Sequence, residues 1–166
     1  MPAPFILHAS VPPGLCVAFY KGTRPGIAGG YNRLGRALDH GPYSHTEVVT
    51  TDGVSLSSSF MDGGVRGKLI GYSSVGDWDF LPIPDPDGEV ERRVWCHFNA
   101  TQGRGYDVTG NIRFALGIVS ETKDKDFCSE WAMAAFGYRE AWRYGPCGAA
   151  TQLQHDFKTT LIEVNR

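Results

Sequence analysis

The chain has 166 residues and a formal net charge of -2, with 16 Lys and Arg residues against 18 Asp and Glu residues. Hydrophobic residues make up 42% and charged residues 20% of the chain, the proportions of an ordinary soluble globular protein. The length fits a single domain, 1–166, and the charge balance argues against a nucleic-acid protein that depends on bulk positive charge. No apolar run approaches the roughly 18 residues needed for a transmembrane segment.

The N-terminal segment, 1–13, is rich in proline and is expected to form an extended arm. Its first eight residues contain no Lys or Arg and only a short apolar run, unlike a secretory signal. We therefore expect a cytoplasmic location. In that compartment free thiols are the default state of the four cysteines, Cys16, Cys96, Cys128 and Cys147.

The first half of the chain reads mainly as strands. Leu15–Tyr20 is short, apolar and bounded by glycines, which predicts a buried strand. A short helix is expected over Tyr31–Leu38. Two further strands are expected over Val65–Ile70 and Trp78–Pro84.

The clearest local signal is a β-hairpin over residues 44–60, with Asp52-Gly53 between two β-prone runs. If these two residues form the whole loop, Glu47 faces Ser58 across the hairpin. His45, Glu47 and Ser58 would then project from the same side of the sheet.

The second half of the chain reads mainly as helices. The expected helices are 88–101, Thr109–Leu116, Asp126–Arg139 and Gln152–Thr160, with a last strand at Leu161–Val164. Asp126 is the expected N-cap of the third of these. This separation of strands from helices predicts an α+β fold.

Cys128 falls in the first turn of an expected helix, where unpaired N–H groups and the helix dipole stabilise a thiolate or an oxyanion. The alternative is a small buried cysteine. His45 opens a strand after a turn, a rigid position for a general base, although a lone histidine can simply pack. Glu47 or Ser58 could orient its imidazole. No His/Cys spacing matches a zinc site, and no phosphate loop is present, so neither metal nor cofactor is expected.

The order of these motifs resembles the circularly permuted branch of the NlpC/P60 (papain-like) superfamily, the group of YiiX/YaeF-type proteins. The resemblance is carried by Tyr43-Ser44-His45, then Tyr106-Asp107, then Phe127-Cys128-Ser129-Glu130. It implies an antiparallel β-sheet or barrel packed against a helix with a nucleophilic cysteine. It also implies Cys128 as nucleophile and His45 as general base. The third polar residue of the superfamily is Glu47 or Ser58 in this sequence.

These residues predict a cysteine hydrolase, a peptidase or amidase or an acyl-ester hydrolase, that acts through a covalent acyl-enzyme. The expected partner is a peptide, amide or lipid-ester substrate. We assign Tyr43, Tyr106 and Ser129, which lie in the motifs, to substrate binding. Two alternatives stay open: a binding module that keeps the fold without the activity, and a phage accessory protein whose cysteines only pack.

Overall fold

The computed structural model describes residues 7–23, 25–26, 29–30, 33, 36–37, 39–108 and 125–164. The strands are β1 (Cys16–Tyr20), β2 (His45–Val49), β3 (Val54–Ser59), β4 (Gly64–Leu69), β5 (Trp78–Pro82), β6 (Gly105–Tyr106), β7 (Lys125–Asp126) and β8 (Ile162–Glu163). The helices are α2 (Glu89–Thr101), α4 (Cys128–Ala135) and α5 (Pro146–Phe157), with 3-10 turns η1 (Val75–Asp77) and η2 (Ala141–Arg143).

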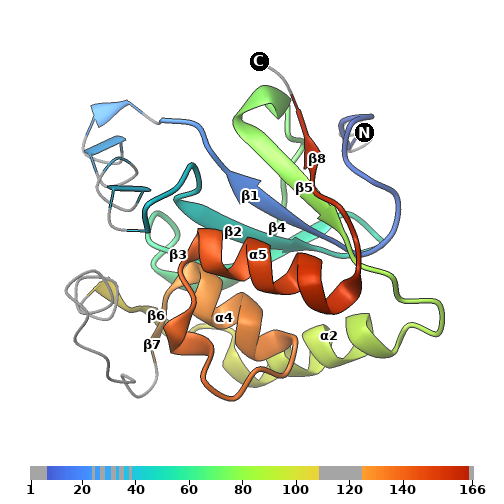
Figure 1. Cartoon of the computed structure of the whole chain (residues 1–166). Helices are drawn as coiled ribbons and strands as arrows, with labels where there is room; N and C mark the ends of the chain where they lie inside the picture. Colours follow the sequence, from blue (N-terminus) through green and yellow to red (C-terminus); the bar gives the residue numbers. More distant parts are fainter. Residues whose placement is uncertain are drawn as a thin grey trace, which may run out of the picture.

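The architecture is α+β, as expected from the separation of strands and helices. The described strands form one curled sheet in the order β7-β6-β4-β3-β2-β1-β5-β8. The sheet is mixed, because β6 and β7 pair in parallel and the other pairs are antiparallel. Figure 1 shows α2, α4 and α5 gathered on one side of this sheet.

Alternation along the central strands separates two clusters of buried side chains. The larger lies between sheet and helices, where Val17, Val48 and Leu56 meet Trp131 and Leu153. The smaller covers the other face of the sheet and contains Cys16, Ala18, Tyr20, Val49, Tyr72, Trp78 and Phe80. Because α4 packs against β2 and β3, the larger cluster fixes the position of α4, including its first residue, relative to these strands.

The hairpin forms as predicted, but its register differs from the expected one by one residue. Val48 pairs with Leu56, and Thr50 N donates to Val54 O at 2.9 Å, so the loop has three residues rather than two. Gly53, with a φ of 83°, is the left-handed residue that such a loop needs. A shift of one residue moves a side chain to the opposite face of the sheet, and Ser58 is therefore not beside Glu47.

Two helix boundaries also differ from the prediction. The third expected helix begins at Cys128 rather than Asp126, which belongs to β7, and ends at Ala135 because Gly137 adopts a φ of 92°. The last expected helix begins earlier, at Pro146, a residue favoured in the first turn.

The strands expected at 15–20, 65–70, 78–84 and 161–164 and the helix expected at 88–101 are confirmed to within one or two residues. The helix expected over 109–116 lies outside the described residues, and most of the one expected over 31–38 does too. Residues 7–13 of the expected arm include a turn, and Val11 is buried in the smaller cluster. None of the described helices is both long and apolar enough to cross a membrane.

Candidate active site

Cys128 is the first residue of α4. Phe127 before it is the N-cap, in an extended conformation, and its N–H donates to Glu130 Oε2 at 3.3 Å. Since the amides of the first helical turn have no partner within the helix, the Cys128 side chain stands at the positive end of the helix dipole. The Cys128 residue is only 3% exposed.

His45 and Glu47 lie two residues apart on β2, so alternation places both side chains on the same face of the sheet. His45 Nε2 lies 2.8 Å from Glu47 Oε1, and the Glu47 side chain is 1% exposed. An ionised carboxylate only accepts hydrogen bonds, so Nε2 is the donor. Nδ1 is then the ring nitrogen left for a proton exchange with a thiol.

The His45 imidazole also interacts with Cys128. Burial alone would lower the pKa of His45, but the charge of Cys128 and a hydrogen bond to its side chain oppose that effect. The hydrogen bond and charge of Glu47 act in the same direction, and together these partners raise the pKa of His45 to about 9. The site therefore favours the protonated form of His45 at neutral pH.

Glu47 has a second cationic partner, Arg66 on β4. Arg66 Nη1 donates to Glu47 Oε2 at 2.6 Å and Nη2 to Glu47 Oε1 at 2.5 Å. Burial by itself would raise the pKa of Glu47, but hydrogen bonds to Arg66 and His45, with their charges, lower it to about 2. Arg66 in turn donates from Nε to Asp62 Oδ2 at 2.8 Å. Sequence reasoning missed Arg66, although strand alternation with the correct register would have placed it near Glu47.

Ser58 does not take part in this chain of contacts. Its Oγ donates to the backbone oxygen of Asp126 at 2.5 Å, just before α4. That carbonyl also accepts from Asp107 N at 3.2 Å. Of the two candidates for the third polar residue, the structure brings Glu47 to His45 and uses Ser58 to tie β3 to the segment that leads into the helix.

The side chains of the three residues assigned to substrate binding lie in different settings. The Tyr43 hydroxyl donates to Asp79 Oδ2 at 2.9 Å and is buried. The Ser129 hydroxyl donates to the Tyr144 carbonyl at 2.8 Å. Tyr106, in β6, is partly exposed and contacts the Phe60 ring edge to face, with centroids 5.8 Å apart.

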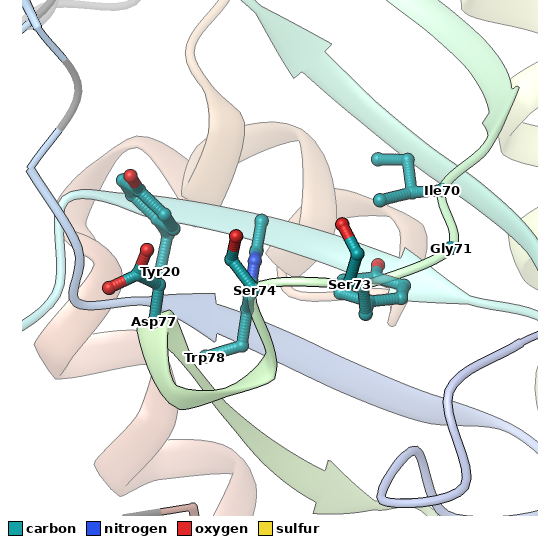
Figure 2. Close-up of a pocket in the computed structure, with 8 residues that line it drawn as sticks. Tyr20, Ile70, Gly71, Ser73, Ser74, Asp77 and Trp78 are labelled. Atoms are coloured by element: carbon teal, nitrogen blue, oxygen red, sulfur yellow. The ribbon is translucent and has the colours of Figure 1, made fainter. Parts of the chain in front are cut away.

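A shallow depression of about 280 Å³ lies on the sheet face that carries His45. Figure 2 shows its lining, in which Tyr20, Asp77 and Trp78 stand along one side and Ile70 and Ser73 on the other. Trp78 connects it to the site, because its ring meets the His45 ring edge to face at 6.4 Å. Cys128 and His45 are not part of its lining.

The other cysteines differ from Cys128 in their surroundings, and the Sγ atom of Cys147 contacts the Tyr43 carbonyl at 3.9 Å. Burial raises the pKa of both Cys16 and Cys147 to about 12, whereas Cys96 is exposed on α2. Among the described residues, no three His, Cys, Asp or Glu side chains come together as a metal site would require. Comparisons of the sequence with protein-family models and with curated proteins find no match.

Proposed function

We propose that this chain is a thiol hydrolase with a papain-like fold of the permuted NlpC/P60 type. The observation that carries the proposal is the series of contacts from Cys128 at a helix start, through His45, to the buried carboxylate of Glu47. A thiol, an imidazole and an orienting acid in this order are the parts that nucleophilic catalysis by cysteine needs.

The reaction would begin from a pair in which the Cys128 proton already resides on His45, so that a thiolate lies beside an imidazolium. The thiolate then attacks a substrate carbonyl, and an S–C bond forms while the carbonyl oxygen becomes an oxyanion. Backbone N–H groups of the first turn of α4 would stabilise that oxyanion. The C–N or C–O bond breaks as His45 returns its proton to the leaving group, which gives an acyl-enzyme.

Water completes the reaction. His45 takes a proton from the water as its oxygen attacks the thioester carbonyl. The S–C bond then breaks, and the proton returns to the Cys128 sulfur. The substrate is a peptide, another amide or a lipid ester, since each offers a carbonyl with a nitrogen or oxygen leaving group.

Alkylation of single cysteines by iodoacetamide at pH 6, read by peptide mass spectrometry, tests the nucleophile. We expect Cys128 to react faster than the exposed Cys96, while Cys16 and Cys147 react slowest because burial raises their pKa values. His45→Ala should slow Cys128 at least roughly tenfold, the effect of losing about 1.4 kcal/mol of thiolate–imidazolium attraction.

His155→Ala is the matched control, because His155 is exposed and interacts with Asp156 far along the chain from β2. Equal slow labelling of all four cysteines in the folded protein would contradict the nucleophile assignment. A p-nitrophenyl acetate burst, with an acetyl group found on Cys128, would extend the test from reactivity to acyl transfer.

The second candidate is a binding or phage accessory protein that keeps the fold without the activity. The 3% exposure of Cys128 favours it, because a packed cysteine has the same burial. The labelling experiment separates the two, since a cysteine that only packs gains nothing from His45.

A further inference from the structure

The carboxylate of Glu47 is shared by two cations rather than one. Its oxygens meet His45 Nε2 at 2.8 Å and two Arg66 nitrogens at 2.5 and 2.6 Å, and its side chain is almost fully buried. The guanidinium therefore forms a two-pronged contact, the geometry in which arginine binds carboxylates most specifically.

Such sharing matters because His45 changes charge during the proposed reaction. When His45 gives its proton to the leaving group, Glu47 loses one of its two positive neighbours. A buried carboxylate with no cation nearby takes up a proton, because burial disfavours the charged form. A protonated Glu47 could become a donor to His45, and the proton would no longer be fixed on Nε2.

We propose that Arg66 is a positioning residue, which keeps Glu47 ionised and correctly placed in both protonation states of His45. Glu47 then accepts from Nε2–H throughout the cycle, and Nδ1 stays available to the Cys128 proton. The inference rests on the proposed function for its purpose. The charge state of Glu47 itself can be measured without any substrate.

The groups around this contact support the assignment. Arg66 is held from its other side by Asp62, which also accepts from Lys68 Nζ at 3.1 Å, and Arg66 Nη1 lies 3.3 Å from the Ser55 carbonyl. A further titratable group near Glu47, among the described residues, is Tyr72 from the segment after β4, whose hydroxyl bonds Ser55 Oγ.

His45 is approached by Cys128 from α4 and by Glu47 from its own strand. The opposite position on β1 is Tyr20. In the described part of the chain, Arg66 is thus the cation that reaches Glu47 from another strand, β4, which is separated from β2 by β3.

The test follows the Glu47 carboxyl carbon by NMR between pH 4 and pH 9. His45→Gln replaces the imidazole by a neutral side chain and so imitates the neutral state of His45. We expect Glu47 to stay ionised over this whole range in His45→Gln. In the double variant His45→Gln/Arg66→Met, Glu47 should titrate with a midpoint above its ordinary pKa of 4.5, since burial is then unopposed.

Lys68→Met, added to His45→Gln, is the matched control, because Lys68 contacts Asp62 but not Glu47 and is half exposed. This control variant should leave Glu47 ionised. Arg66→Lys, combined with His45→Gln in place of Arg66→Met, should also keep Glu47 mostly ionised, because lysine retains the positive charge. If the double variant does not fold, the titration of Glu47 in the single variant His45→Gln tests the proposal. A Glu47 midpoint above 4.5 in that variant would overturn the role of Arg66.

An unchanged Glu47 signal in the folded double variant would overturn the proposal equally. Neither result depends on catalysis. If Cys128 proves unreactive, the hydrolase assignment is wrong, but the Glu47 titration still tests the role of Arg66. If Cys128 is reactive and Glu47 does not titrate as expected, only the role assigned to Arg66 is wrong.

Discussion

Replacing Glu47 by Gln is the sharpest test of the electrostatics of the site. The change removes one negative charge 2.8 Å from His45 Nε2 and keeps the shape of the side chain. It also leaves the Arg66 guanidinium with Asp62 as its remaining carboxylate partner. Both consequences disfavour a positive imidazole, so the pKa of His45 should fall.

The magnitude follows from the structure. The pKa of His45 rises from its ordinary 6.5 to about 9, a difference that corresponds to about 3 kcal/mol in favour of the imidazolium. An opposite charge at this distance accounts for roughly one to three pH units, so we expect a pKa of roughly 6–8 in Glu47→Gln. Breaking a buried ion pair should also cost about 3–5 kcal/mol of folding free energy.

The stability of the unmodified protein carries a matching pH dependence. Because the pKa of His45 is raised on folding, its contribution is complete below pH 6.5 and is lost as the pH rises through about 9. The pKa of Glu47 is lowered instead, so its contribution is complete above pH 4.5 and is lost as the pH falls towards about 2.

Histidine NMR titrations between pH 6 and pH 10 and urea unfolding between pH 2 and pH 10 measure these effects. The His45 resonance is assigned by its loss in His45→Ala. Glu140→Gln is the control, since Glu140 is exposed and its ion pair with Arg143 is exposed too. A His45 pKa near 6.5 in the unmodified protein, or an identical value in Glu47→Gln, would refute the reasoning.

Two further substitutions test how the scaffold holds the site. Ser58→Ala should cost about 1 kcal/mol in urea unfolding, because a buried hydrogen bond to the Asp126 carbonyl is lost, and should leave the His45 titration unchanged. A shifted His45 pKa would contradict the purely structural role of Ser58. Gly64→Ala should cost at least about 2 kcal/mol, since Gly64 has a φ of 147° and a Cβ there would stand 1.9 Å from the Arg104 carbonyl oxygen. Gly63→Ala, with a φ of 80° and open space around it, is the matched control and should cost about 1 kcal/mol; equal losses would disprove the clash.

Relations within one strand could be predicted from the sequence, whereas relations between strands could not. His45 and Glu47 share a face because side chains alternate along any strand, whatever its partner. Ser58 lies on the same face of the sheet as His45 and Glu47 only if the hairpin loop between β2 and β3 has two residues. Asp-Gly is compatible with loops of two or three residues, so the pattern could not fix the register.

Short elements also escaped prediction. The two-residue strand β7 is stabilised by its pairing with β6, and neither has a local hydrophobic pattern. Asp126 therefore resembles a helix cap in the sequence, while tertiary pairing makes it a strand residue. Arg66 was missed for a related reason, since its role follows from the position of β4 opposite β3 rather than from a motif.

The burial of Trp131 means that mutations distant from Cys128 can affect the candidate site. Trp131 is fully buried in α4, and its indole N–H donates to Thr101 Oγ1 at 2.9 Å, at the far end of α2. An eight-residue helix has little stability in isolation, so this anchor and its neighbours hold α4 in place. Changes in α2 can therefore displace the Cys128 sulfur from the His45 imidazole without altering either residue. Under the proposed function, variants that lose activity should then appear in α2 as well.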